Sequence, residues 1–177
     1  MKKTLVLVML LAVGFFVSGC SGSKEVENKP KVTVDSGTLS SGVTVGKELA
    51  DFSFKNQFGE DVKLDNKVKK IIFVFTKPTG HLVREYLKKQ PKNYLESRDT
   101  LFIADISGMP SIIAKMFAIP DMKKSDYQIL LIKEKANAKM FRNEKHKDAV
   151  MIISLDNKIV KNVKFVTNEK DLVAEID

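Results

Sequence analysis

The side chains best suited to chemistry follow a buried-strand pattern near the middle of the chain. Five apolar residues, 71–75, run directly into the sequence Thr76-Lys77-Pro78-Thr79-Gly80-His81, and helical spacing begins at Leu82. In α/β proteins, functional groups gather where a central strand ends and a helix begins. This segment has hydroxyl, ammonium and imidazole groups but no thiol, no cluster of metal ligands and no phosphate-binding glycine motif. We therefore predict that these six residues form a loop that binds a ligand or a partner.

An acidic side chain, Asp105, ends a second predicted buried strand at 101–106. If Asp105, Thr79 and His81 converged within hydrogen-bonding distance, they could activate a hydroxyl in a non-thiol hydrolase or transferase. A turn or capping role for Asp105 is favoured over catalysis. His81 is favoured as a solvated histidine at a helix start, and His146, between two lysines, as solvent-facing. No catalytic residue is assigned.

The methionines suggest a third function, a metal or small-ligand carrier. Thioether sulfur suits Cu(I), and His81 could complete such a site. Two of these methionines, however, lie in apolar patterns that are typical of core residues. No metal site and no cofactor is therefore predicted. The methionines considered are Met109, Met116, Met122, Met140 and Met151, of which Met116 and Met151 are the two predicted core residues.

The start of the chain has the pattern of an exported protein. Residues 1–19 combine two lysines with an apolar run that is too short to cross a bilayer comfortably, which predicts a signal peptide. It ends in Val17-Ser18-Gly19-Cys20, which resembles the bacterial lipobox. The resemblance implies that Cys20 is the lipid attachment site, with a diacylglyceryl group on its sulfur and an acyl chain such as palmitate on its amine. Cys20 is the only cysteine, so the chain can form no internal disulfide.

Lipidation would determine where the protein resides. Two or three acyl chains anchor stably, because each buried methylene contributes about 0.8 kcal/mol. We expect a lipid-anchored cell-envelope protein that faces the periplasm, with the membrane as one partner and an envelope protein as another. By resemblance to lipoproteins of bacteria with two membranes, Ser21 after Cys20 favours the outer membrane. Residues 20–44 are mostly small or polar, which predicts a lipid-anchored flexible tether.

Composition limits the classes of partner. Of the 177 residues, 44% are hydrophobic, enough for one domain core. The net charge of +8 falls to +6 without Lys2 and Lys3 of the predicted leader. This charge favours acidic partners or anionic lipid head groups. The lysines are scattered and are not interleaved with aromatic residues, so we expect no nucleic-acid partner.

Strand and helix patterns alternate through a single predicted domain at 45–177. Their order is hairpin, strand, helix, strand, helix, strand, hairpin and helix, which indicates a largely parallel sheet between helical layers. Segment 136–141 fits either a short helix or an edge strand. The predicted strands are 52–54, 62–64, 71–75, 101–106, 127–132, 149–155 and 159–166, and the predicted helices begin near Leu82, Pro110 and Asn168 and end, for the first two, at Pro91 and Pro120.

Three stretches of this domain resemble the thioredoxin-like superfamily, and within it the branch of peroxiredoxins and membrane-tethered thiol oxidoreductases. They are the opening 45–54 with Gly59, the strand 71–75, and the hairpin 149–160 with its Asp156-Asn157 turn. The resemblance implies an α/β fold: a three-layer sandwich with an N-terminal β-hairpin and a mixed central sheet.

The departures from this family determine the functional interpretation. Redox members have a cysteine where this chain has residues 76–82, and the peroxidatic position falls on Thr79. Lys147-Asp148 stands where the family has its cis-proline. A hydroxyl without an adjacent base is a poor nucleophile at neutral pH, whereas peroxide and disulfide chemistry need a thiolate. We therefore predict a redox-inactive binding or scaffolding module.

Overall fold

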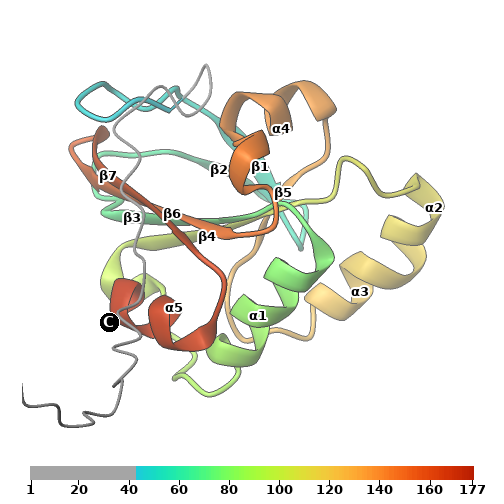
Figure 1. Ribbon diagram of the computed structural model, residues 1–177. Coiled ribbons are helices and arrows are strands. Elements are labelled where there is room, and N and C mark those ends of the chain that lie inside the picture. Colours follow the sequence, from blue (N-terminus) through green and yellow to red (C-terminus); the bar gives the residue numbers. More distant parts are fainter. Residues whose placement is uncertain (1–42) are drawn as a thin grey trace, which may run out of the picture.

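The computed structural model describes residues 43–177, so the predicted signal peptide, Cys20 and nearly all of the predicted tether lie outside the described residues. Seven strands form one mixed sheet (Figure 1). They are β1 (Ser53–Asn56), β2 (Asp61–Lys63), β3 (Lys70–Val74), β4 (Thr100–Asp105), β5 (Leu130–Ile132), β6 (Val150–Asp156) and β7 (Ile159–Val166). Their order across the sheet is β2-β1-β5-β4-β3-β6-β7. β3, β4 and β5 are parallel, and every other neighbouring pair is antiparallel.

The central strand β3 is buried on both faces, as its unbroken apolar run predicts. Ile71, Ile72 and Phe73 have no solvent exposure. Ile72 pairs with Phe102 of β4 on one side and with Ile152 of β6 on the other. Because successive side chains of a strand point to opposite faces, β3 contributes to two separate cores.

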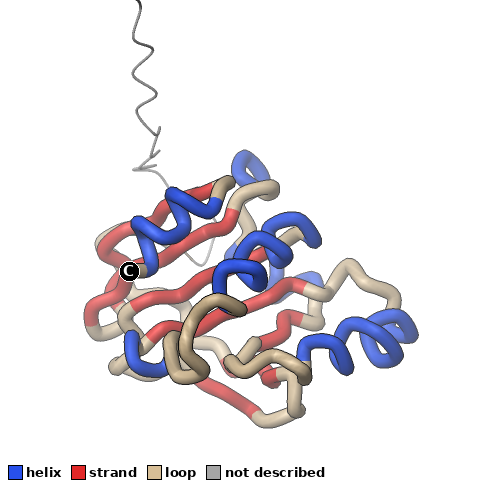
Figure 2. Tube along the Cα trace, turned by 90° about the horizontal axis from the view of Figure 1, so that it is seen from below, coloured by secondary structure: helices blue, strands red, loops and turns tan. Residues whose placement is uncertain are grey.

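Helices cover both faces of the sheet (Figures 1 and 2). One face carries α1 (Lys77–Leu87), the short helix η1 (Glu96–Arg98), a helical segment from α2 (Ser111–Ile113) through η2 (Ala114–Ala118) to α3 (Ile119–Met122), and α5 (Glu169–Ile176). The opposite face is covered by α4 (Lys135–Phe141), and the one-turn helix η3 (Glu144–His146) follows it. The expected three-layer α/β architecture with an N-terminal hairpin and a mixed sheet is confirmed. The expectation of a largely parallel sheet is wrong, because only the β3–β4 and β4–β5 pairs are parallel.

A cluster of aromatic rings attaches α4 to its face of the sheet. Phe141 of α4 stacks on Phe73, with ring centroids 5.1 Å apart. It also meets Phe52 edge-on at 5.8 Å, and Phe52 stacks on Phe54 of β1 at 4.8 Å. Such offset and edge-to-face pairs are favourable beyond their buried area. Segment 136–141, which fitted either a helix or a strand, is thus a helix that buries Phe141.

Two boundaries in the second half of the domain differ from the prediction. The strand predicted at 127–132 is only three residues long, because Gln57 occupies the backbone groups before it. The Gln57 side chain donates to the carbonyl of Tyr127 and accepts from the amide of Ile129, both at 2.8 Å. The second helix does not end at Pro120. It runs on to Met122, since the backbone stays helical through Ala118 and Ile119 and a wide π-turn over 114–118 precedes Pro120.

The last helix, α5, is joined to the rest of the domain by a polar cluster around two buried tyrosines. The hydroxyls of Tyr86 and Tyr94 contact each other, and both donate to the carboxylate of Asp177. Lys70 of β3 donates to the backbone carbonyls of Glu175 and Ile176. These bonds satisfy carbonyl groups at the end of α5 that have no partner within the helix. The cluster therefore connects α1, β3 and α5.

Asp177 makes this connection sensitive to acid. Hydrogen bonds from Tyr94 and then Tyr86 hold the pKa of Asp177 below its ordinary value of 3.8. A carboxylate with a lowered pKa in the folded state stabilises the protein above its unfolded pKa, and this contribution is lost as the pH falls through the folded value. We predict that the free energy of unfolding of the wild type, measured with urea, falls below about pH 4. The Asp177→Asn variant should be less stable at pH 7, and its free energy of unfolding should change less through the acid range. Asp148→Asn, at an exposed position, should follow the wild type; a steep acid profile in Asp177→Asn would contradict the prediction.

Candidate functional site

The predicted binding loop lies at the edge of the sheet where β3, β4 and β5 end. It is largely helical rather than a loop: α1 begins at Lys77, so residues 77–81 form its first turn. Thr76 is the N-cap with extended backbone angles, φ −135° and ψ 159°. Pro78 lies within the first turn, where its missing N–H leaves no bond unmade. The early helix start is therefore explained by Thr76 and Pro78, which the sequence interpretation assigned to a loop.

Thr79, the position that the family resemblance gives to the reactive thiol, is a capping residue. The residue is only 3% exposed. Its hydroxyl donates to the carbonyl of Thr76 at 2.9 Å, and it accepts from the Thr76 amide at 3.2 Å and the Thr76 hydroxyl at 3.1 Å. This is a capping box, in which the third helical residue reaches back to the N-cap. The bonding capacity of the Thr79 hydroxyl is used within the helix start.

The other residues of this turn divide into exposed and inner positions. Lys77, Pro78 and His81 are exposed, so these three are available to a partner. Gly80 faces inward, and a Cβ added there would lie 3.8 Å from Val74, an ordinary van der Waals distance. The surface that the turn offers is therefore one ammonium group, one imidazole and one proline ring.

Asp105, at the end of β4, is the most buried charged group at this edge, with a side chain 2% exposed. One carboxylate oxygen accepts from the amide of Ser107 at 2.8 Å, which confirms the predicted turn role. The other accepts from the guanidinium of Arg142 at 2.8 Å, and the same nitrogen of Arg142 donates to the carbonyl of Phe75 at 3.3 Å. Arg142, the residue after α4, thus links this helix to the ends of β3 and β4.

Arg142 is the residue that the sequence interpretation missed. The only available signal was the carboxylate of Asp105 at the end of an apolar strand, because a buried carboxylate needs a cation or several donors nearby. Nothing in the sequence distinguished Arg142 from the other cations as that partner. Its guanidinium also lies over the Phe75 ring, 5.6 Å from the centroid.

The structure does not join the three residues of the hydrolase or transferase alternative. Thr79 bonds to Thr76, Asp105 bonds to Arg142 and Ser107, and His81 is exposed. Between residues 43 and 177, no hydrogen bond connects Thr79, Asp105 and His81. The side-chain contact on which general base catalysis by this set depends is not formed.

The methionines of the carrier alternative lie in different parts of the domain. Met151 and Met140 belong to the core beneath α4, whereas Met109 and Met122 pack in the core beneath α1. Met151 is buried as predicted, but Met116 is 65% exposed, so its assignment to the core was wrong. No group of three or more histidine, cysteine, aspartate or glutamate side chains in the described part of the chain could hold a metal ion.

His146 also differs from its prediction. It is half-buried rather than solvent-facing, because its ring stacks on Phe165 of β7 with centroids 4.2 Å apart. The neighbouring Lys147 and Asp148, at the position that the family resemblance gives to the cis-proline, are both exposed just before β6.

Solved structures of other proteins share this fold. No family model matches the chain, and no curated protein is similar to it in sequence. The chain is similar to a proposed protein disulfide isomerase from Bacteroides thetaiotaomicron, with TM-score 0.51, 18% identity and coverage of 78% of this chain and 90% of that one. It is also similar to a peroxidoxin from Mycobacterium tuberculosis, with TM-score 0.51, 16% identity and coverage of 75% of this chain and 93% of that one. A peroxiredoxin-like protein from Aquifex aeolicus matches with TM-score 0.51, 10% identity and coverage of 82% of this chain and 90% of that one. The fold is therefore thioredoxin-like, and the single cysteine, Cys20, lies outside the described domain.

The capping role of Thr79 can be tested by removing only its hydroxyl. We predict that Thr79→Val, which keeps the shape but leaves the Thr76 amide unpaired, lowers the free energy of unfolding by about 1 kcal/mol. Thr79→Ser keeps the hydroxyl and should lose less. Urea unfolding of both variants measures this difference, and equal losses would show that the hydroxyl does not contribute.

The buried ion pair gives a larger effect. We predict that Arg142→Met destabilises the domain by about 3 kcal/mol, because it leaves the Asp105 carboxylate buried and unpaired. Adding Asp105→Asn to Arg142→Met should restore part of this loss, so that the double variant is more stable than the sum of the single changes by about 1 kcal/mol or more. Lys69→Met, which breaks an exposed ion pair with Asp99, serves as the control and should cost less than about 1 kcal/mol. Additive losses in the double variant would contradict the prediction.

Proposed function

We propose that this protein is a lipid-anchored cell-envelope protein whose thioredoxin-like domain binds a protein partner without thiol chemistry. The proposal rests on the hydrogen bonds of the Thr79 hydroxyl. A hydroxyl fully used in a helix cap stands at the position that the resemblance gives to the peroxidatic thiol. A capping threonine supplies neither a thiolate nor a free nucleophile, so what the fold retains at this edge is a surface.

The proposed binding surface is the exposed side of the first turn of α1. Lys77, Pro78 and His81 are exposed there, and Thr79 behind them fixes the turn. The ion pair between Asp105 and Arg142 holds the adjoining ends of β3 and β4 together. A surface that is already rigid loses little conformational freedom when a partner binds. The net charge, +6 without Lys2 and Lys3 of the predicted leader, favours an acidic segment of that partner.

The anchoring part of the proposal rests on the lipobox pattern at Cys20. Between residues 43 and 177, no helix is both long enough and apolar enough to cross a bilayer. Acylation at Cys20 would hold the domain at the membrane, where it meets other envelope proteins. Ser21 favours the outer membrane as the location. A non-lipidated Cys20→Ser protein tests whether capture of the partner depends on anchoring.

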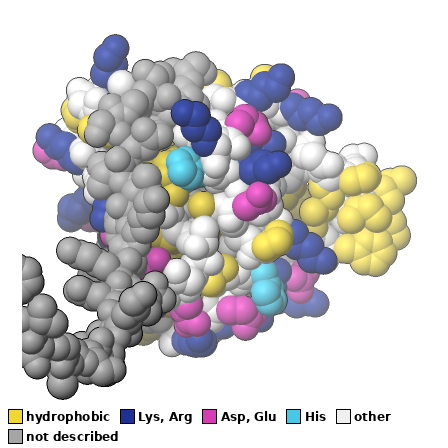
Figure 3. All heavy atoms as spheres, in the orientation of Figure 1, with side chains coloured by type: hydrophobic (Ala, Val, Ile, Leu, Met, Phe, Trp, Pro, Cys, Tyr) yellow, Lys and Arg dark blue, Asp and Glu magenta, His cyan; other side chains and the backbone are white. Residues whose placement is uncertain are grey.

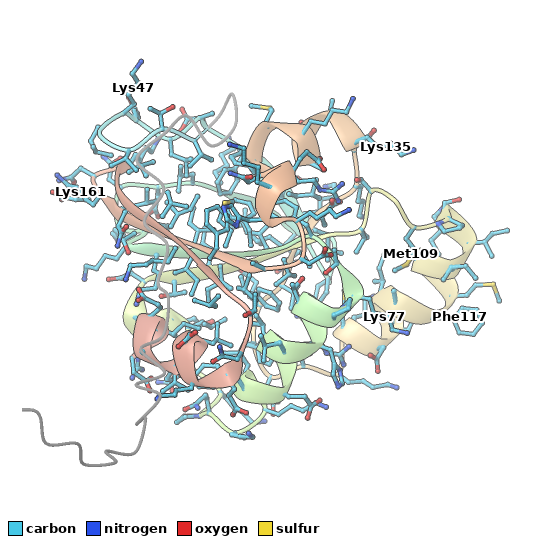
Figure 4. The ribbon with its side chains drawn as sticks, in the orientation of Figure 1. Lys47, Lys77, Met109, Phe117, Lys135 and Lys161 are labelled. Atoms are coloured by element: carbon cyan, nitrogen blue, oxygen red, sulfur yellow. The ribbon has the colours of Figure 1, made fainter. Side chains whose placement is uncertain are left out.

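In-cell crosslinking of the full-length protein tests the proposed surface. We predict that Lys77→Glu combined with His81→Ala lowers the recovery of a crosslinked envelope protein about tenfold, the loss that corresponds to about 1.4 kcal/mol of binding free energy. Lys47→Glu makes the same charge reversal at the opposite end of the domain (Figure 4) and should leave recovery unchanged.

The Cys20→Ser protein completes the design. It should lose the crosslinked partner because it no longer resides at the membrane, while its domain unfolds as in the wild type. Recovery of the same partner in equal amounts from the Lys77→Glu, His81→Ala protein would refute binding through this turn.

A further inference from the structure

The helical segment 111–122, here named the apolar arm, displays four large apolar side chains to solvent. Ile112 is 66% exposed, Ile113 43%, Met116 65% and Phe117 61%. They form the largest apolar patch visible on this face of the molecule, at the end that carries α2 and α3 (Figure 3). Contiguous apolar side chains on a surface indicate a site of interaction with a protein or a membrane.

The apolar arm is apolar on both of its sides. Ala114, Ile119 and Met122 pack against the core beneath α1, and this inner side holds the arm on the domain. Arg84 of α1 adds an ion pair to Asp121 at 2.8 Å. A surface helix of a soluble protein normally turns a polar face to water, so the outer side of the arm is unsuited to water.

Cations border the exposed apolar side. Lys115 lies within it, and Lys123 and Lys124 follow directly after α3, all three exposed. The carboxylate of Asp121 is neutralised by Arg84 and lies 3.7 Å from Lys124. An apolar face flanked by lysines is the pattern of a helix that lies in the interface of an anionic bilayer.

We propose that the apolar arm inserts into the surface of an anionic bilayer, with Ile112, Ile113, Met116 and Phe117 as the inserted side chains. This contact goes beyond the proposed function, because it is a second membrane contact at a site far along the chain from Cys20. The 23 positions from Cys20 to Val43 can span at most about 80 Å, which is enough for the arm to reach the membrane that holds the anchor.

A bilayer fits this surface better than a second copy of the chain. The four exposed apolar residues lie on one helical segment, whereas a stable protein interface draws about 20–30 residues, polar ones included, from each partner. Interfacial helices bury their apolar face only about 5–10 Å into the head-group region, a depth that side chains on one helical side can reach. The bordering lysines would then face lipid phosphates rather than another cationic protein.

Tryptophan fluorescence tests insertion in the full-length chain, which contains no tryptophan. Phe117→Trp places a reporter on the arm, and Phe58→Trp places a control on the turn between β1 and β2, where Phe58 is 56% exposed. In vesicles containing phosphatidylglycerol, we expect the emission of Phe117→Trp to shift to shorter wavelength and to be quenched by brominated lipids. The emission of Phe58→Trp should stay as in water.

Two further measurements decide between lipid and protein. In the Phe117→Trp background, Lys115→Gln with Lys123→Gln should reduce the shift several-fold, and vesicles of phosphatidylcholine alone should give a smaller shift than anionic ones. Equal access of aqueous iodide to both reporters on anionic vesicles would overturn the proposal. Shielding of the Phe117→Trp reporter from iodide without lipid would also overturn the proposal. Shielding that increases with protein concentration would indicate a second copy of the chain, and shielding that requires another protein would indicate a protein partner. Because crosslinking through Lys77 is measured separately, failure of this proposal is distinguishable from failure of the proposed function.

Discussion

Ile71, Ile72 and Phe73 of β3 are completely buried, and that burial requires a cover on each face of the sheet. On one face the cover is α1, with α5 attached through Tyr86, Tyr94 and Asp177. On the other face it is the aromatic cluster around Phe141 of α4. Helices α1 and α4 begin at the same edge of the sheet, because they follow the parallel strands β3 and β5. The first turn of α1, the ion pair of Asp105 and the position of the apolar arm all follow from this arrangement.

The same edge explains why one residue changes the chemistry so strongly. The first turn of a helix carries unpaired amide groups and a positive dipole end, which lower the pKa of a thiol placed there and favour its thiolate. A threonine hydroxyl does not ionise at neutral pH, so the same position can supply only hydrogen bonds. In Thr79 these bonds close the helix start onto Thr76. The first turn of α1 therefore carries a hydroxyl with a structural role at this edge.

Local patterns predicted those parts of the fold that depend on neighbouring residues. The hairpins and the strands at 71–75 and 101–106 were found because the apolar runs and turn residues are contiguous in sequence. The ion pair between Asp105 and Arg142 joins residues 37 positions apart, and no local pattern carries that information. The stacking of His146 on Phe165 and the shortening of β5 by Gln57 are likewise contacts between distant segments.

The apolar arm shows a different failure of sequence reasoning. Helical spacing of apolar residues predicts a buried side, but a helix that is apolar all round gives no indication of which side the core covers. In this chain Ala114, Ile119 and Met122 took the inner side, so Met116 was wrongly assigned to the core.

The two proposals constrain each other through the contact between α1 and the arm. Arg84 of α1 is ion-paired to Asp121 of α3, and Leu82 packs in the same core as Ile119. Insertion of the arm would therefore bring the first turn of α1 close to the lipid head groups. A partner that binds Lys77 and His81 would then have to reach them at the membrane surface, which favours a membrane-associated envelope protein over one that diffuses freely. The anchor at Cys20 and the arm would fix the domain at two points, and the partner-binding turn would take its orientation from both.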